Sequence, residues 1–89
     1  PYPISLHIRL PNARHASPKC DGSTISLSGV ALSSTIGSVR DRVQVEALDR
    51  SVGASKLQLW VGGKPATLRQ TLAYWNVAEG ETIEFTLGK

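Results

Sequence analysis

Four segments of the chain alternate apolar and polar residues, which is the pattern of a strand with one buried face. They are residues 4–10, 25–28, 57–61 and 82–87. In the last segment Ile83, Phe85 and Leu87 share one face, and Glu84 stands on the other. The first two segments are predicted to pair antiparallel, and Gly29 interrupts the second with a bulge or bend. The pattern therefore predicts four strands of one sheet.

The period changes at Thr35, where apolar residues begin to recur at helical spacing. The apolar stripe consists of Ile36, Val39 and Val43, and Val45 and Leu48 are expected to widen it. The hydroxyl of Thr35 can cap the first turn by accepting a hydrogen bond from a backbone N–H. The spacing predicts a helix over residues 36–49.

The connections between these elements contain turn-forming residues. Residues 12–23 are polar and predict an exposed loop with its turn at Asp21-Gly22. Gly62-Gly63-Lys64-Pro65 turns the chain and leaves room for only a short edge strand, because proline lacks the N–H that a sheet needs. A short connecting helix is expected near residues 72–77. The order ββαββ predicts an α+β domain with one helix packed on a mixed sheet of four to five strands.

Composition limits the chain to one small domain. Its 89 residues suit a single core, so residues 1–89 are expected to form one domain of a longer protein, monomeric when isolated. The single cysteine, Cys20, excludes an internal disulfide, and no apolar run is long enough for a membrane span. A soluble intracellular module is therefore expected. The net charge of +3 permits an anionic partner without requiring one.

Several short strings in this order resemble the ubiquitin-like family. They are Thr24-Ile25 on the second strand, Thr35-Ile36 at the helix start, Thr71-Leu72 and Trp75-Asn76-Val77 before the last strand. The resemblance covers nearly the whole chain and is densest in its last third. It implies a ubiquitin-like β-grasp fold. Asn76 is expected in the left-handed conformation, which asparagine tolerates better than most residues.

Within the family, three strings are similar to the splicing factor 3A branch. They are Leu10-Pro11-Asn12, Lys56-Leu57-Gln58 and Leu72-Ala73-Tyr74-Trp75-Asn76. The branch implies a non-catalytic domain of a nuclear pre-mRNA splicing factor that contacts a small nuclear RNA stem-loop of the particle that recognises the 5′ splice site. Other spliceosomal proteins would bind the rest of that longer protein. The branch also carries a basic tail, which this sequence does not include.

The resemblance implies a set of RNA-binding residues. Lys56, Lys64, Tyr74 and Lys89 correspond to the RNA face of the branch, and Arg69 is a further candidate for phosphate contact. In a ubiquitin-like sheet the strands beside Lys56, Lys64 and Lys89 are neighbours. The three ammonium groups are therefore expected to border one face.

A protein–protein adaptor that does not bind RNA is the alternative function. Its face would consist of Gln58, Trp60 and Glu84, which point outward by strand parity. Ordinary ubiquitin receptors need exposed aliphatic residues at such positions, and this chain has Gln58, Glu84 and Thr86 there. Binding to those receptors is not expected.

The sequence offers no constellation for catalysis, a metal or a cofactor. Cys20 and His15 share a loop without any feature that would lower the pKa of the thiol, so a surface thiol is expected. Two such side chains are too few for zinc. The glycines before Lys64 lack the rest of a phosphate-loop motif. We therefore predict a protein that is not an enzyme.

Three aromatic residues are candidates for contact with a partner. Tyr74 and Trp75 either close the core, with the indole N–H or the phenol bonded to the backbone, or expose a ring that stacks on a base. Of the two, Trp75 is expected in the core, whereas Tyr74 suits either position. Trp60 points outward by parity, where it would contact a partner or shield the sheet beneath the long loop.

Overall fold

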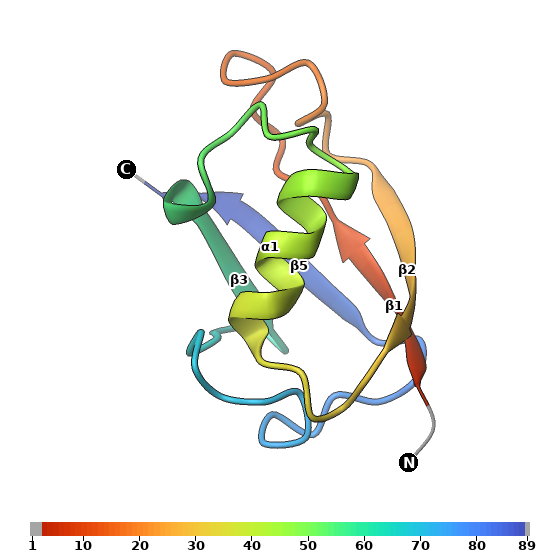
Figure 1. Ribbon diagram of the computed structural model, residues 1–89. Coiled ribbons are helices and arrows are strands. Elements are labelled where there is room, and N and C mark those ends of the chain that lie inside the picture. The colour runs from red at the N-terminus through yellow and green to blue at the C-terminus, as the bar shows by residue number, and fades with distance from the viewer. Residues whose placement is uncertain (1–2, 89) are drawn as a thin grey trace.

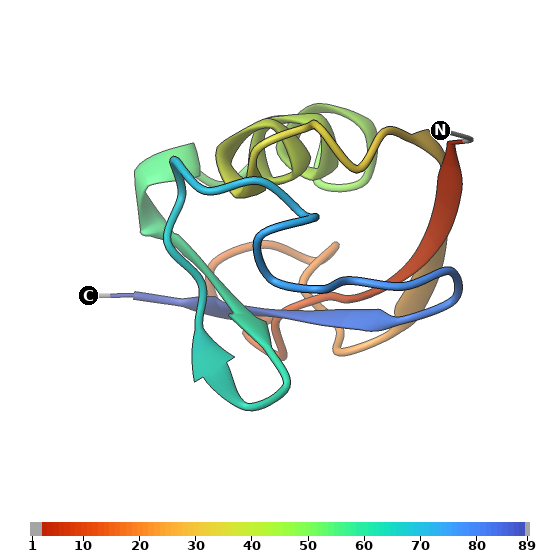
Figure 2. The same ribbon diagram turned by 90° about the horizontal axis from the view of Figure 1, so that it is seen from below.

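The computed structural model describes residues 3–88 and contains a five-stranded mixed sheet with one α-helix across one face (Figures 1 and 2). The elements are β1 (Ile4–Arg9), β2 (Thr24–Val30), α1 (Ile36–Glu46), the 3₁₀ helix η1 (Ala54–Lys56), β3 (Leu57–Val61), β4 (Lys64–Pro65) and β5 (Thr82–Leu87). The predicted α+β class is confirmed, and the arrangement is compatible with a β-grasp. The two-residue β4 makes the order differ from the predicted ββαββ.

The strand order across the sheet is β2-β1-β5-β3-β4. β1 and β5 are parallel neighbours at the centre, and the other pairs are antiparallel. The register of β1 and β2 shifts beside Gly29, whose φ is +67°, so the predicted bulge is confirmed. Alternate strand residues such as Leu6, Ile8 and Phe85 are buried against α1 and form the core.

Helix α1 begins where the sequence predicts and ends earlier. Thr35 caps it by accepting from the N–H of Ser38 at 3.1 Å. The helix ends at Glu46, not at residue 49, and Leu48 is buried in the turn that follows. The predicted place of Val45 on the apolar side is wrong. Val45 is 43% exposed because it stands beyond the stripe that packs on the sheet.

The loop between β1 and β2 is partly buried, which corrects the prediction of an exposed loop. The Ala13 N–H donates to the carbonyl of Cys20 at 2.9 Å, and the loop places Ala13, Ser17 and Cys20 in the interior. Cys20 is 0% exposed and therefore is not a surface thiol. Burial, and after it the charge of Asp21, raises the pKa of this thiol.

Residues 66–81 connect β4 to β5, and part of this segment packs against the first turn of α1. The carbonyls of Gln70 and Leu68 accept from the N–H groups of Ile36 and Gly37 at 2.9 and 2.8 Å, which satisfies the first turn of the helix. The predicted short helix after Thr71 is a series of turns. Asn76 has φ +54°, as predicted.

Candidate interaction surfaces

The face of the sheet opposite α1 is left open by the ribbon (Figure 2), and residues of β1, β3 and β5 stand on it. Directly paired residues on neighbouring strands share a face. The register pairs Arg9 with Glu84, Glu84 with Trp60 and Trp60 with Pro65. We call this surface the uncovered face, since no helix among residues 3–88 packs on it. It is defined by His7, Arg9, Gln58, Trp60, Thr82, Glu84 and Thr86.

Trp60, on β3, is held in place on the uncovered face beside Glu84 of the central strand β5. Its side chain is partly exposed, and its indole N–H donates to Oγ1 of Thr86 at 2.8 Å. Gln58 pairs with Thr86, and Glu84 pairs with Trp60. The structure therefore brings together all three residues that the sequence predicts for a protein-binding face.

The rest of the uncovered face is polar. Its other members are hydroxyl, imidazole and guanidinium side chains of Thr82, Thr86, His7 and Arg9. The exposed large hydrophobic residues of the described chain, Val45, Leu68 and Tyr74, belong to none of its strands. Trp60 is thus an aromatic anchor surrounded by hydrogen-bonding groups, a composition suited to recognition by an aromatic contact with a polar rim.

The predicted RNA-binding residues are not gathered in one patch. Lys56 directly precedes β3, whereas Lys64 begins β4 and lies beside the last residue of β3, so the two stand at opposite ends of a strand that spans roughly 13 Å. Lys64 also pairs with Val61, which is buried on the helix side of the sheet. Arg69 belongs to the segment that caps α1. Lys89 lies outside the described residues. The expectation that the lysines border one face is therefore wrong for Lys64.

Tyr74 and Trp75 point to different environments. Tyr74 is 64% exposed, whereas Trp75 is partly buried against the core. Their rings meet edge to face with centroids 6.0 Å apart. Among the described residues the buried Nε1 of Trp75 has no hydrogen-bond partner.

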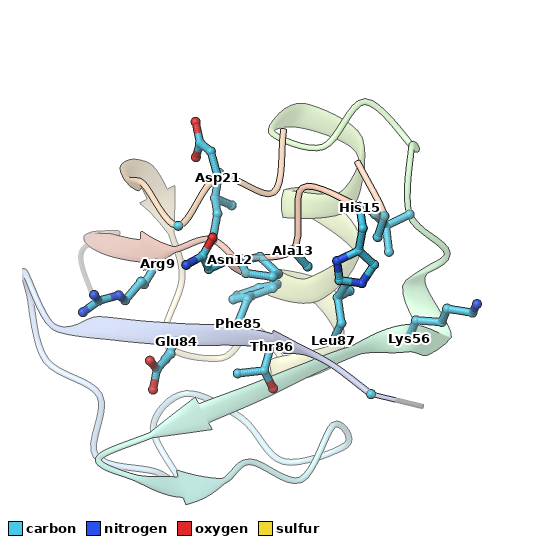
Figure 3. Close-up of a pocket in the computed structure, with 16 residues that line it drawn as sticks. Arg9, Asn12, Ala13, His15, Asp21, Lys56, Glu84, Phe85, Thr86 and Leu87 are labelled. Carbon is cyan, nitrogen blue, oxygen red and sulfur yellow. The ribbon is translucent and has the colours of Figure 1, made fainter. Parts of the chain in front are cut away.

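A hollow of about 780 Å³ lies at one end of β5 and was not predicted from the sequence (Figure 3). One wall is the β1–β2 loop with Asn12 and His15, and the other is β5 with Phe85 and Leu87. Lys56 borders the same end as His15 (Figure 3). We call this space the hollow. The residue of the sequence that points to the hollow is Pro11. It lies just after the end of β1, whereas the neighbouring strand β5 extends further to Leu87.

The two ends of the hollow differ in charge. His15 and Lys56 lie near Leu87, whereas Arg9, Glu84 and Asp21 lie at the opposite end (Figure 3). Arg9 and Glu84 are register partners and offset one another. The carboxylate of Asp21 is charged at neutral pH, and hydrogen bonding to Ser23 lowers its pKa further. One end is therefore basic and the other carries a net negative charge.

No known family model matches this chain, and a search of curated proteins found no match either. Within residues 3–88 no helix has the length and hydropathy to cross a membrane. The same residues contain no cluster of three His, Cys, Asp or Glu side chains that is able to hold a metal ion.

Proposed function

We propose that this chain is a non-catalytic, ubiquitin-like interaction domain that binds a partner protein through the uncovered face. The sheet order with parallel central strands and one covering helix supports the ubiquitin-like resemblance of the sequence. The observation that carries the proposal is the arrangement of Gln58, Trp60 and Glu84 on adjacent strands. A tryptophan already fixed by a hydrogen bond loses little conformational freedom on binding, and such residues are enriched among binding hot spots.

Affinity capture from a cell extract tests this function with matched variants. Glu84→Lys reverses the charge at the centre of the face on an exposed side chain, so the fold should be unaffected. Val45→Ala is the control, because it changes an exposed residue of α1 on the other side of the sheet. We expect a partner protein that is retained by the wild type and by the control, and at least tenfold less by Glu84→Lys. Equal retention of the same partner by the wild type, Val45→Ala and Glu84→Lys would contradict the proposal.

A second candidate function is RNA binding, as the splicing-factor resemblance implies. The observation that favours it is the excess of cations around the hollow and its loop. Arg9, Arg14, Lys19 and Lys56 are all exposed there, against the carboxylates of Asp21 and Glu84. In this proposal the domain acts in the nucleus on a small nuclear RNA stem-loop. Lys56 belongs both to this group and to the set that the resemblance implies.

Two measurements separate RNA binding from protein binding. Ribonuclease treatment of the extract would abolish capture that depends on RNA and leave direct protein capture unchanged. A purified RNA hairpin that contacts two to three cations should show a slope of log affinity against log salt of roughly −2. Lys56→Glu should weaken that binding, and Lys64→Glu should not, since Lys64 lies away from the hollow. Absence of hairpin binding at low salt would exclude the RNA function for this domain.

A further inference from the structure

Strand β2 forms one edge of the sheet, and part of its backbone points away from the rest of the domain. Figure 1 shows no segment beyond β2 on the side away from β1. The N–H of Leu10 donates to the carbonyl of Ser23 at 2.9 Å, so the register bonds the odd-numbered residues of β2 to β1. In an antiparallel pair, such residues alternate with residues whose N–H and C=O point away from the partner strand. The outward groups are those of Thr24, Ser26 and Ser28.

These outward groups are accessible from solvent. Thr24, Ser26 and Ser28 are all exposed, and among residues 3–88 no segment pairs with their outer side. The shift in register lies beyond them, beside Gly29. The open edge therefore extends from Thr24 to Ser28 without interruption.

The other edge of the sheet is protected, whereas β2 is not. Proteins block open edges with very short strands, lysine, proline or a bulge. β4, at the opposite edge, is only two residues long and consists of Lys64 and Pro65. β2 has neither a charged residue nor a proline. An uncharged open edge of this kind is a template for pairing with another strand.

We propose that β2 pairs antiparallel with β2 of a second copy of this chain, around a two-fold axis at Ser26. In this register Ser26 lies opposite its own counterpart, and Thr24 lies opposite Ser28 of the second copy. Every outward N–H and C=O of the three residues then has a partner, and any shifted register would pair fewer of them. The opposed side chains are hydroxyls, so no like charges meet at the axis.

The side of this edge that faces α1 is also self-complementary. Two small cavities between β2 and α1 show the order of residues along it. One places Glu46 beside Ile25, and the other places Arg42 beside Gly29. The two-fold axis reverses this order in the second copy, so Arg42 of each copy lies level with Glu46 of the other. Opposite charges at the same level favour the antiparallel pairing.

The pairing would join two domains into one continuous sheet. Both helices would cover one side of it, and both uncovered faces would lie together on the other side. A partner with two contact sites would then bind two copies of Trp60 with increased avidity. The paired segment is short compared with a standard interface of about 1,600 Å², so we expect a weak dimer with a Kd of about 0.1 mM. The isolated domain should be monomeric when dilute. This inference does not rest on the proposed function.

Sedimentation velocity from about 10 µM to about 1 mM tests the pairing, because the expected Kd lies within this range. The wild-type domain should change from monomer to dimer as its concentration rises. Hydrogen exchange at the Ser26 amide should slow with concentration. Exchange at the Leu27 amide should not, because this group is already bonded to β1. A monomer at the highest concentration, or a dimer with unchanged Ser26 exchange, would overturn the proposal.

Charges introduced at the two-fold axis distinguish this pairing from any other contact. Ser26→Lys and Ser26→Glu each place like charges opposite one another, so each variant alone should associate roughly tenfold more weakly than the wild type. An equimolar mixture of the two should form dimers again, because unlike charges are then opposed. Thermal melts check that both variants fold, as expected for changes at an exposed residue.

Thr82→Lys is the matched control. It adds the same charge to an exposed residue of β5, away from the edge, and should dimerise like the wild type. Two results would show that the contact lies elsewhere and overturn the proposal. One is association of Ser26→Lys equal to that of the wild type, and the other is a mixture of the two Ser26 variants that stays monomeric.

Discussion

The hydroxyl oxygens of Ser17 and Ser51 lie 2.7 Å apart and join two loops that are 34 residues apart in sequence. Ser51 donates its own proton to the carbonyl of Leu48, so Ser17 is the donor to Ser51. Ser17 in turn accepts from the N–H of Lys19. This chain of bonds fixes the β1–β2 loop against the turn after α1 and so holds one wall of the hollow.

Loss of the Ser51 hydroxyl should destabilise the domain. Ser51→Ala leaves the buried Ser17 hydroxyl without its acceptor, which should lower the free energy of unfolding by about 1–2 kcal/mol. Ser55→Ala is the control, since Ser55 is exposed in η1. Urea unfolding of the three proteins measures both changes. Equal stability of all three would show that the loop is not held by this bond.

The thiol of Cys20 should react slowly in the folded domain. Burial raises its pKa above the ordinary value of 9.0, and only the thiolate attacks a disulfide reagent. Reaction with an aromatic disulfide at pH 7 should therefore accelerate strongly in denaturant. Because the folded state retains a proton that the unfolded state loses, this thiol should contribute less stability as the pH rises above 9.0. Rapid reaction of the native protein would contradict the buried position.

Substitution by phenylalanine should change the stability of the domain differently at the two tryptophans. Trp60→Phe removes an indole N–H that is bonded to Thr86, and should cost about 1 kcal/mol of stability. Trp75→Phe removes a buried N–H that lacks a partner among the described residues, so its loss should be smaller or reversed. Thermal melts of both variants test the difference. A larger loss for Trp75→Phe would mean that its indole has a bonding partner.

Substitution by alanine should likewise cost different amounts of stability at two valines of α1. Val43 is 0% exposed beneath the helix, and Val43→Ala should cost about 1–3 kcal/mol. Val45 is 43% exposed, and Val45→Ala should change stability by less than about 0.5 kcal/mol. Calorimetry of both variants checks the orientation of the helix. Similar midpoints for the two variants would contradict it.

The regular elements were predictable because their patterns are local. Alternation identified the four longer strands, and the spacing of Ile36, Val39 and Val43 identified the helix. The same spacing rule misplaced Val45, since whether a residue at the edge of a stripe is covered depends on how the helix sits on the sheet. The sequence of the helix alone does not determine how the helix is rotated on the sheet.

The β1–β2 loop and the hollow depend on contacts between distant segments. Ser17 and Cys20 belong to a polar stretch and are buried because other segments cover them. Pro11 was read from the sequence as the end of a strand. That the pairing of β1 with β5 ends at Arg9 and Glu84, shortly before Pro11, follows only from the parallel register of the two strands, which residue patterns do not determine. The predicted place of Lys64 was wrong for the same reason, because the hairpin register sets the face of this residue.

The two indole N–H resonances provide the most direct test of the uncovered face. Trp60 lies on that face, whereas Trp75 packs against the core beside the exposed Tyr74, one of the predicted RNA contacts. The measurement is a ¹⁵N spectrum of the domain before and after addition of the protein that it captures. Our account predicts that the Trp60 indole signal shifts on binding and the Trp75 signal stays in place. A shift confined to Trp75, with Trp60 unchanged, would contradict it.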